Sequence, residues 1–253
     1  MNLILLIILF ALMVLLGGVR GLKLFLSLLF NFIILMVSFY LMALGVSPIV
    51  VSFIACFIII TFLLYFVNGK NVKTKTSFLA VLIILVLLSL LIMVLTKKTL
   101  IAGFGYESFE EINMFSYDVH LDFTNIAVAL VLIGLIGAVV DASMAITSAL
   151  YEVYQNNKEL SQKELFQSGL TIGKDILGTT MNTLLFAFLS EFMTLFLWFQ
   201  LGGYSILDII NNKTFVTEVI KIMICALGCV FIIPLSSFLL AYHLRHSSEI
   251  EDD

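Results

Sequence analysis

The sequence predicts an all-α membrane protein, a polytopic transmembrane helical bundle of about seven spans. Hydrophobic residues make up 62% of the 253-residue chain, charged residues only 12%, and the mean hydropathy is +1.17. Several apolar runs reach the roughly 20 residues that a helix needs to cross the hydrocarbon of a bilayer. We therefore treat residues 1–253 as a single transmembrane domain and assign its spans in order.

Short polar or glycine-containing breaks separate the apolar runs. Gly45 to Pro48 forms the break between the second and third spans, and the Asn-Gly-Lys stretch at residues 68–70 ends the third. The first run lacks the basic start and the cleavage site of a signal peptide, so we expect it to be retained. The predicted spans are about 2–17, 24–45, 48–67, 77–96, 125–150, 174–200 and 215–242.

Basic residues predict that the N-terminus lies outside and the C-terminus inside, because lysine and arginine are enriched in inside loops. Lys221, near the start of the last span, is left out of the comparison. With this orientation, the inside loops carry Arg20, Lys23, Lys70, Lys73, Lys75, Lys158, Lys163, Lys174 and Arg245. The outside loops carry Lys97, Lys98 and Lys213. An odd number of spans is required by this topology.

The chain divides into four regions of different character. Residues 1–96 form an almost featureless apolar half of four helices, and residues 97–124 form the longest outside loop. We expect that acidic and aromatic loop to be solvated and anchored at the interface, with a cation- or partner-binding surface as the alternative. Residues 125–242 form a core that holds most of the intramembrane polar residues, and residues 243–253 form a cytoplasmic acidic tail.

An ordered inside segment precedes the sixth span. Ser161 and Glu164 have the S-x-x-E spacing of a capping box, which predicts that a helix begins there. We expect a short amphipathic helix on the cytoplasmic surface that bends into the sixth span. Gly169, Gly173 and Gly178 would permit the bend or a close approach to a neighbouring helix.

Asp141 is the most informative residue, because it lies inside the long apolar run of residues 126–150. An ionised carboxylate in hydrocarbon costs several kcal/mol, so it rarely occurs there without a role or a partner. Desolvation allows such a carboxyl to hold or release a proton near neutral pH. Three interpretations remain: proton or ion handling, a structural hydrogen bond to another helix, and an assembly contact with a charged partner helix.

A polar stripe on the next span is the expected partner of Asp141. Asp141, Ser148 and Glu152 share one face of the fifth span, at i, i+7 and i+11. Asp175, Thr179, Asn182 and Phe186 form a stripe on the sixth span, with Thr183 beside it. The candidate proton- or ion-handling residues are Asp141, Ser148, Thr179, Asn182 and Thr183. Glu191 is a secondary acid that we expect near the outer interface.

The motifs of enzymes and nucleic-acid-binding proteins are missing from the sequence. We expect no enzymatic activity and no catalytic residues, because no Ser/His pair, paired aspartates or zinc motif falls at one depth in the spans. We also expect no metal and no cofactor. We interpret Cys56, Cys225 and Cys229 as small buried hydrophobic residues, with a metal or redox pair at Cys225 and Cys229, which are spaced i,i+4, as the alternative. No basic stripe predicts a nucleic-acid partner.

Much of the chain resembles the YibE/YibF family of bacterial multi-span proteins. The resemblance is carried by GAVVDASMAITSALYEV (residues 137–153), LSQKELFQSGLTIGKDILGTTMNTLLFAF (160–188), GGVRGLKLF (17–25) and NGK (68–70). The short length and the lack of a soluble outer domain resemble the shorter, YibF-like member. The resemblance implies a multi-pass protein of the bacterial plasma (inner) membrane, of largely unassigned activity and often encoded beside a larger YibE-like relative, and it supplies no substrate.

A weaker similarity links the core to the proton-reading helices of SecD/SecF and the resistance–nodulation–division proteins. In that comparison Asp141 matches the proton-carrying aspartate, although Ala142 stands where a second acid often occurs and no lysine lies deep in the sixth span. The main functional hypothesis is a subunit of a proton-coupled transport or export system, embedded in the bilayer with a larger homologous partner or as a homo-oligomer. Its small-molecule or ion substrate is not specified by the sequence. The alternative is a structural or assembly subunit with no transport activity of its own.

Overall fold

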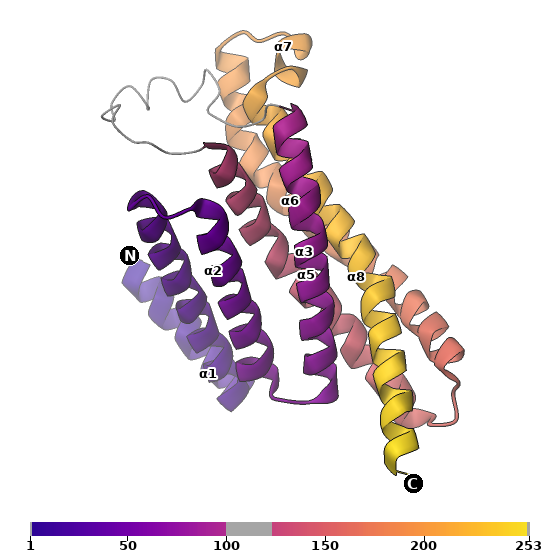
Figure 1. Ribbon diagram of the computed structural model, residues 1–253. Coiled ribbons are helices and arrows are strands. Elements are labelled where there is room, and N and C mark those ends of the chain that lie inside the picture. Colours follow the sequence, from indigo (N-terminus) through magenta and orange to yellow (C-terminus); the bar gives the residue numbers. More distant parts are fainter. Residues whose placement is uncertain (1, 100–122, 252–253) are drawn as a thin grey trace.

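The protein is a bundle of long helices, described by a computed structural model in which residues 2–99 and 123–251 are placed (Figure 1). Six of its helices are long and apolar enough to cross a membrane, and the described part of the chain has no strand. This confirms the predicted all-α membrane bundle. The elements are α1 (Asn2–Ala43), α2 (Pro48–Phe62), the π-helix η1 (Leu63–Val67), α3 (Val72–Thr99), α5 (Phe123–Asn156), α6 (Gln162–Leu201), α7 (Ile206–Ile210) and α8 (Lys213–Glu251).

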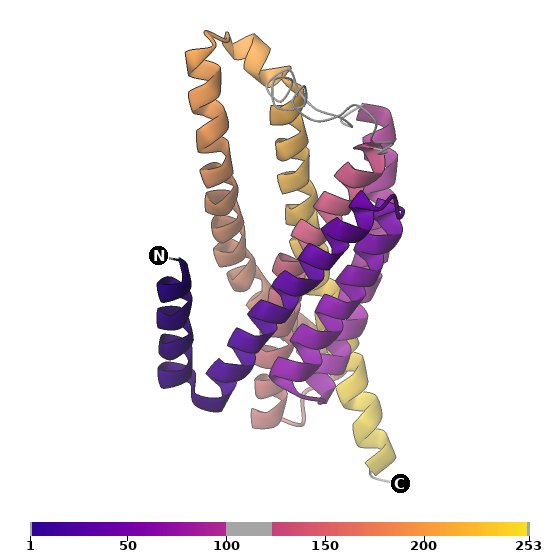
Figure 2. The ribbon, with the colours of Figure 1, turned by 90° about the vertical axis from the view of Figure 1, so that its left-hand side faces the viewer.

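Helix α1 contains the first two predicted spans as two arms that meet at a sharp kink. Gly18 has a φ of 54° at the kink, in the left-handed region that glycine adopts at little cost. A side chain at Gly21 would collide with the backbone carbonyl of Met13, so only glycine permits this close approach. Figure 2 shows that the chain reverses direction between the arms. The seven predicted spans therefore correspond to the two arms of α1 and to α2, α3, α5, α6 and α8.

Helices α3, α5 and α8 pack together at the centre of the bundle. Their contact surfaces are apolar and fully buried at Leu88, Leu132 and Ile232. Gly228 brings α8 close to α5, because a Cβ placed there would lie 2.5 Å from Leu135 Cδ1. Tight packing of this kind is the main attraction between helices that are surrounded by lipid.

Helix α6 is one continuous helix of 40 residues, so the predicted bend between a surface helix and the sixth span is wrong. The predicted capping box is confirmed: the Ser161 hydroxyl accepts from the Glu164 amide, and the Glu164 carboxylate accepts from the Ser161 amide at 2.8 Å. Gly169 and Gly173 permit α6 to pack closely against α8 and do not bend the helix. A Cβ at Gly169 would lie 2.6 Å from Ser237 Oγ, and one at Gly173 would overlap Ile233 of α8.

The two ends of the bundle differ in charge. The α1 kink, the turn before α3, the turn before α6 and the C-terminus lie at one end (Figure 1). That end carries the basic residues that were assigned to the inside, which is consistent with the predicted N-out, C-in topology. At the other end α6 connects through α7 to α8. The predicted outside loop at 97–124 falls largely on residues 100–122, which lie outside the described residues.

The outer end of α6 is fixed by aromatic contacts and by a second capping box. Phe192 of α6 and Phe215 of α8 have ring centroids 5.4 Å apart. The Asp208 carboxylate of α7 accepts from the Ser205 hydroxyl at 2.6 Å and from the Ser205 amide at 3.0 Å. These hydrogen bonds favour the charged carboxylate and lower the pKa of Asp208 below its ordinary value.

Candidate functional site

Asp141 lies on the outward face of α5, in the middle of a predicted span. It belongs to a stripe of exposed residues at helical spacing, with Gly134 and Gly137 before it and Ala145 after it. Asp141 forms no hydrogen bond within the part of the chain that the structure describes. The carboxylate is therefore available to a proton, an ion or a partner.

The opposite face of α5 carries a buried chain of hydroxyl groups. Ser77 Oγ of α3 and Thr147 Oγ1 of α5 lie 2.7 Å apart, and Thr147 Oγ1 donates to the Ser143 carbonyl at 2.9 Å. The Ser143 hydroxyl lies 2.9 Å from that of Ser236 on α8. All four side chains are fully buried. These bonds satisfy polar groups that would otherwise be costly in an apolar interior, and they connect α3, α5 and α8.

The contacts at the inner end fix the register of α6 against α5. A Cβ on Gly169 would lie 3.0 Å from Leu150 Cδ2, so these residues face each other. Because the two helices run in opposite directions, Gly178 reaches the level of Asp141, about 13 Å further along each axis. Nothing lies within 4 Å of a Cβ on Gly178, so α6 leaves this position open.

The polar stripe of α6 is exposed and does not bond to Asp141. Thr179 Oγ1 donates to the Ile176 carbonyl at 2.9 Å, and Thr183 Oγ1 donates to the Thr179 carbonyl at 3.0 Å. Both threonine hydroxyls are thus turned back onto their own helix, and the Asn182 side chain is also exposed. The direct hydrogen bonds expected from Thr179, Asn182 or Thr183 to Asp141 are not formed in the single chain.

The remaining candidate residues lie away from Asp141. Ser148 is half-buried two helical turns toward the inner end, where it lines a separate basic pocket. Glu191 lies in α6 toward the outer end, and its side chain lies outside the described structure. The predicted site residues therefore do not come together at one place in the described structure.

Two features of the buried polar core were not predicted. The sequence does not single out Ser77 or Ser236: Ser236 lies inside an apolar run, as many serines of membrane helices do, and Ser77 stands at the start of one. His243 Nδ1 lies 3.1 Å from the Leu239 carbonyl and 3.5 Å from Thr76 Oγ1. Within residues 2–99 and 123–251, no group of three or more His, Cys, Asp or Glu side chains is placed to hold a metal ion. The three cysteines are free and buried.

Comparison with known proteins identifies the family of this chain. No curated protein and no solved structure matches it significantly, so the similarity to SecD/SecF remains a hypothesis. The family model described as YibE/F-like protein matches residues 5–246, which is nearly the whole chain. The match includes both the Asp141 helix and the polar stripe of α6. Together with the six membrane-spanning helices, it shows that this multi-pass membrane protein belongs to the YibE/F-like family.

Proposed function

We propose that this protein is a subunit of a proton-coupled transport or export system in the bacterial plasma membrane. It acts with a larger homologous membrane protein, and Asp141 carries the proton. The observation that supports this proposal is the position of Asp141, which is exposed at mid-helix and has no hydrogen-bond partner in the described chain. The proposal assigns no chemical catalysis to the subunit.

The free energy of the Asp141 carboxylate in the bilayer depends on what covers it. An ionised carboxylate facing lipid costs several kcal/mol, so the group either binds a proton or meets a polar surface. A proton carrier must do both in turn, because it exchanges its proton with a water-filled or polar path. Exposure on one face of α5 leaves room for such a path at the boundary with another subunit.

The unburied helices support the existence of that other subunit. Within an 18-residue apolar stretch of α5, 56% of the residues are buried. In comparable stretches of α1 and α6, only 6% and 12% of the residues are buried. Gly134, Gly137 and Gly178 have nothing within 4 Å of a Cβ, so packing within the chain does not require them to be small. Small residues permit a second helix to approach closely.

The alternative function is that of a structural or assembly subunit. In that case Asp141 serves only to bind a partner helix, and its ability to exchange a proton is irrelevant. The same exposed position supports this alternative, because an unpaired carboxylate is a strong assembly contact in lipid. The two functions predict different effects when Asp141 is replaced by an uncharged residue of the same shape.

Substitution of Asp141 separates the two functions. Asp141→Asn keeps the size and hydrogen bonding but cannot exchange a proton, whereas Asp141→Leu removes both. The proposal expects Asp141→Asn to insert and co-purify with its partner normally, yet to lose proton movement in proteoliposomes under an imposed pH gradient. Ala145→Asn, one turn away on the same face, is the control and should retain normal proton movement. Normal proton movement in Asp141→Asn, combined with loss of the partner in Asp141→Leu, would favour the assembly function.

Infrared difference spectroscopy tests the ionisation of Asp141 directly. A carboxyl band that titrates between about pH 5 and pH 9 in the complex, and that is missing in Asp141→Asn, supports proton carriage. A carboxyl that stays protonated over this range, in the presence and absence of the partner, contradicts it.

A further inference from the structure

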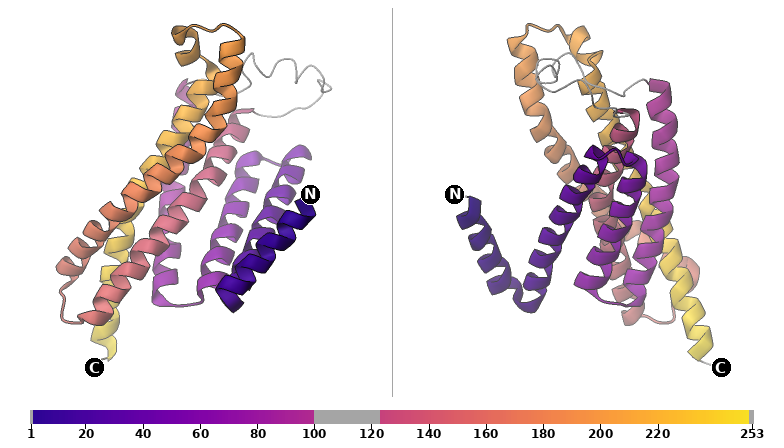
Figure 3. Two further views of the ribbon diagram at one scale, coloured as in Figure 1. Left: turned by 180° about the vertical axis from the view of Figure 1, so that it is seen from behind. Right: turned by 60° about the vertical axis from the view of Figure 1, so that its left-hand side comes forward.

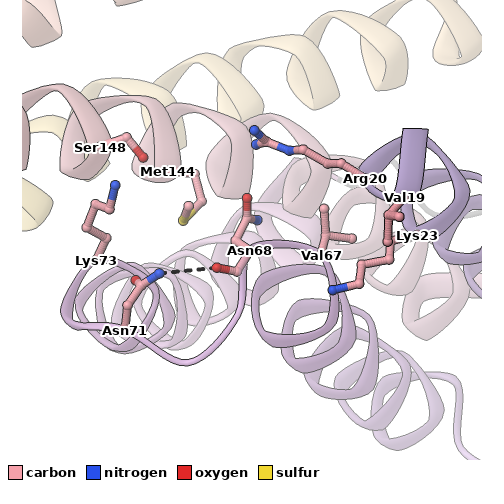
Figure 4. Close-up of a pocket in the computed structure, with 9 residues that line it drawn as sticks. All are labelled: Val19, Arg20, Lys23, Val67, Asn68, Asn71, Lys73, Met144 and Ser148. Carbon is pink, nitrogen blue, oxygen red and sulfur yellow. Dashed lines mark hydrogen bonds between the residues drawn. The ribbon is translucent and has the colours of Figure 1, made fainter. Parts of the chain in front are cut away.

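A basic pocket of about 480 Å³ lies at the inner end of the bundle, away from Asp141 (Figure 4). Its cationic side chains are Arg20 and Lys23 of α1 and Lys73 of α3. Its neutral polar side chains come from Asn68 and Asn71, in the turn before α3, and from Ser148 of α5. Residues far apart in the sequence thus provide one set of hydrogen-bond donors.

The fold holds these donors in place through two glycine-dependent bends. Arg20 and Lys23 follow directly after the α1 kink at Gly18, one helical turn apart. On the other side, Gly69 has a φ of 75° and turns the chain from η1 into α3. Figure 3 shows the α1 kink and this turn at the same end of the bundle.

Hydrogen bonds fix the turn that carries Asn68, Asn71 and Lys73. The Asn71 carbonyl oxygen Oδ1 accepts from the Thr74 amide at 2.9 Å, and Asn71 Nδ2 donates to the Asn68 carbonyl at 3.1 Å. Thr74 Oγ1 donates to the Gly69 carbonyl at 2.8 Å. The pocket wall is therefore preorganised, which reduces the entropy that a ligand must lose on binding.

The pocket has an excess of positive charge that the chain does not neutralise. No aspartate or glutamate lines it, and Arg20, Lys23 and Lys73 form no salt bridge within the described residues. Lys73 Nζ lies 5.0 Å from the centroid of the Tyr151 ring, a contact that orients the ammonium without cancelling its charge. Figure 4 shows the Lys73 and Ser148 side chains pointing toward one another.

We propose that this pocket binds the phosphate of an anionic membrane lipid. Arginine and lysine supply the charge that a phosphate requires, and the serine and asparagine side chains add neutral donors. The surface of α1 beside the pocket is apolar and accessible: Leu15, Leu16 and Val19 are 79%, 88% and 75% exposed. Acyl chains can lie along this surface while the phosphate enters the pocket. Basic pockets between helices on the cytoplasmic side are typical sites for such head groups.

The test uses native mass spectrometry of the purified full chain, titrated with phosphatidylglycerol or with phosphatidylcholine of the same acyl chains. The pocket variant is Arg20→Gln/Lys23→Gln/Lys73→Gln. The matched control is Lys70→Gln/Lys158→Gln/Lys163→Gln, which removes the same charge from exposed positions at the same end but outside the pocket. Circular dichroism and gel filtration confirm that both variants are folded.

We expect the wild type and the control variant to bind phosphatidylglycerol alike, and the pocket variant to bind it roughly 100-fold more weakly. Phosphatidylcholine should bind weakly to all three proteins. Equal losses in the two variants would overturn the proposal, because they would show general surface electrostatics. A third arm adds soluble glycerol phosphate. If it displaces no lipid, the lipid is the source of the phosphate; tight binding of glycerol phosphate with no lipid preference would overturn the lipid assignment.

Discussion

The Ser143 and Ser236 hydroxyls lie 2.9 Å apart in the core and join α5 to α8. Both side chains are fully buried, and the same stretch of α5 bonds to α3 through Thr147 and Ser77. The hydroxyl chain therefore fixes the rotation of α5 about its axis. That rotation in turn determines that Asp141 faces outward.

Removing one hydroxyl from this chain should destabilise the bundle modestly. Ser143→Ala and Ser236→Ala should each lower the free energy of unfolding by about 1 kcal/mol, and the double mutant should lose less than the sum. Unfolding in mixed micelles measures both effects. Ser190→Ala is a suitable control, because the exposed Ser190 hydroxyl donates only to the Ala187 carbonyl of its own helix. Strict additivity would show that the two serines are not coupled.

The glycines of α6 should differ sharply in their tolerance of alanine. Gly173→Ala forces Ile233 to move and should cost about 1–3 kcal/mol of stability. Gly178→Ala meets no neighbour and should be neutral or stabilise the helix by up to about 1 kcal/mol. The free energies of unfolding of the two variants, measured under identical conditions, test this prediction. Equal effects would contradict the observed packing of α6 on α8.

The kink in α1 should depend on Gly21. The Phe10 and Phe25 rings lie 4.9 Å apart between the two arms, so cysteines at these positions should be joined efficiently by a short bifunctional thiol cross-linker. Adding Gly21→Ala should reduce this cross-linking, because its Cβ collides with the Met13 carbonyl. Gly17→Ala, where the Cβ meets nothing within 4 Å, should leave cross-linking unchanged. Efficient cross-linking in Gly21→Ala would rule out this close approach.

The capping box of α7 should weaken in acid. Hydrogen bonds from Ser205 lower the pKa of Asp208 below its ordinary value of 3.8. A lowered folded-state pKa means that the contribution to stability is complete above 3.8 and is lost as the pH falls through the folded-state value. NMR titration of the Asp208 carboxyl should therefore give a midpoint below 3.8. In Ser205→Ala the midpoint should rise, and an unchanged midpoint would exclude the hydroxyl as the cause.

The fold was largely predictable, because span length and charge asymmetry are properties of single segments. The capping box at Ser161 was also predicted correctly, since it depends on local spacing. The continuity of α6 was not predicted: glycine permits a bend or a close contact equally, and only the position of α8 shows which occurs. The close approach of the two arms of α1 was likewise not predicted, because it depends on the contact between Gly21 and the Met13 carbonyl.

The candidate site was less predictable, because it depends on which helix faces meet. Helical periodicity placed Asp141 and Ser148 on one face correctly, but it contains no information on the rotation of α6. The exposed positions of Thr179 and Asn182 follow from the glycine contacts at the inner end of α6. The hydroxyl chain was overlooked because serine and threonine are common in membrane helices and no short motif distinguishes the buried ones.

The separation of the two faces of α5 has a practical consequence for labelling. Cys56, Cys225 and Cys229 are each 0% exposed, so the native thiols are shielded from reagents. A single cysteine in place of the exposed Ala145 would then be the only reactive thiol on this helix. A fluorophore attached there would report on whatever approaches the Asp141 face, while the hydroxyl chain behind it keeps the helix in register.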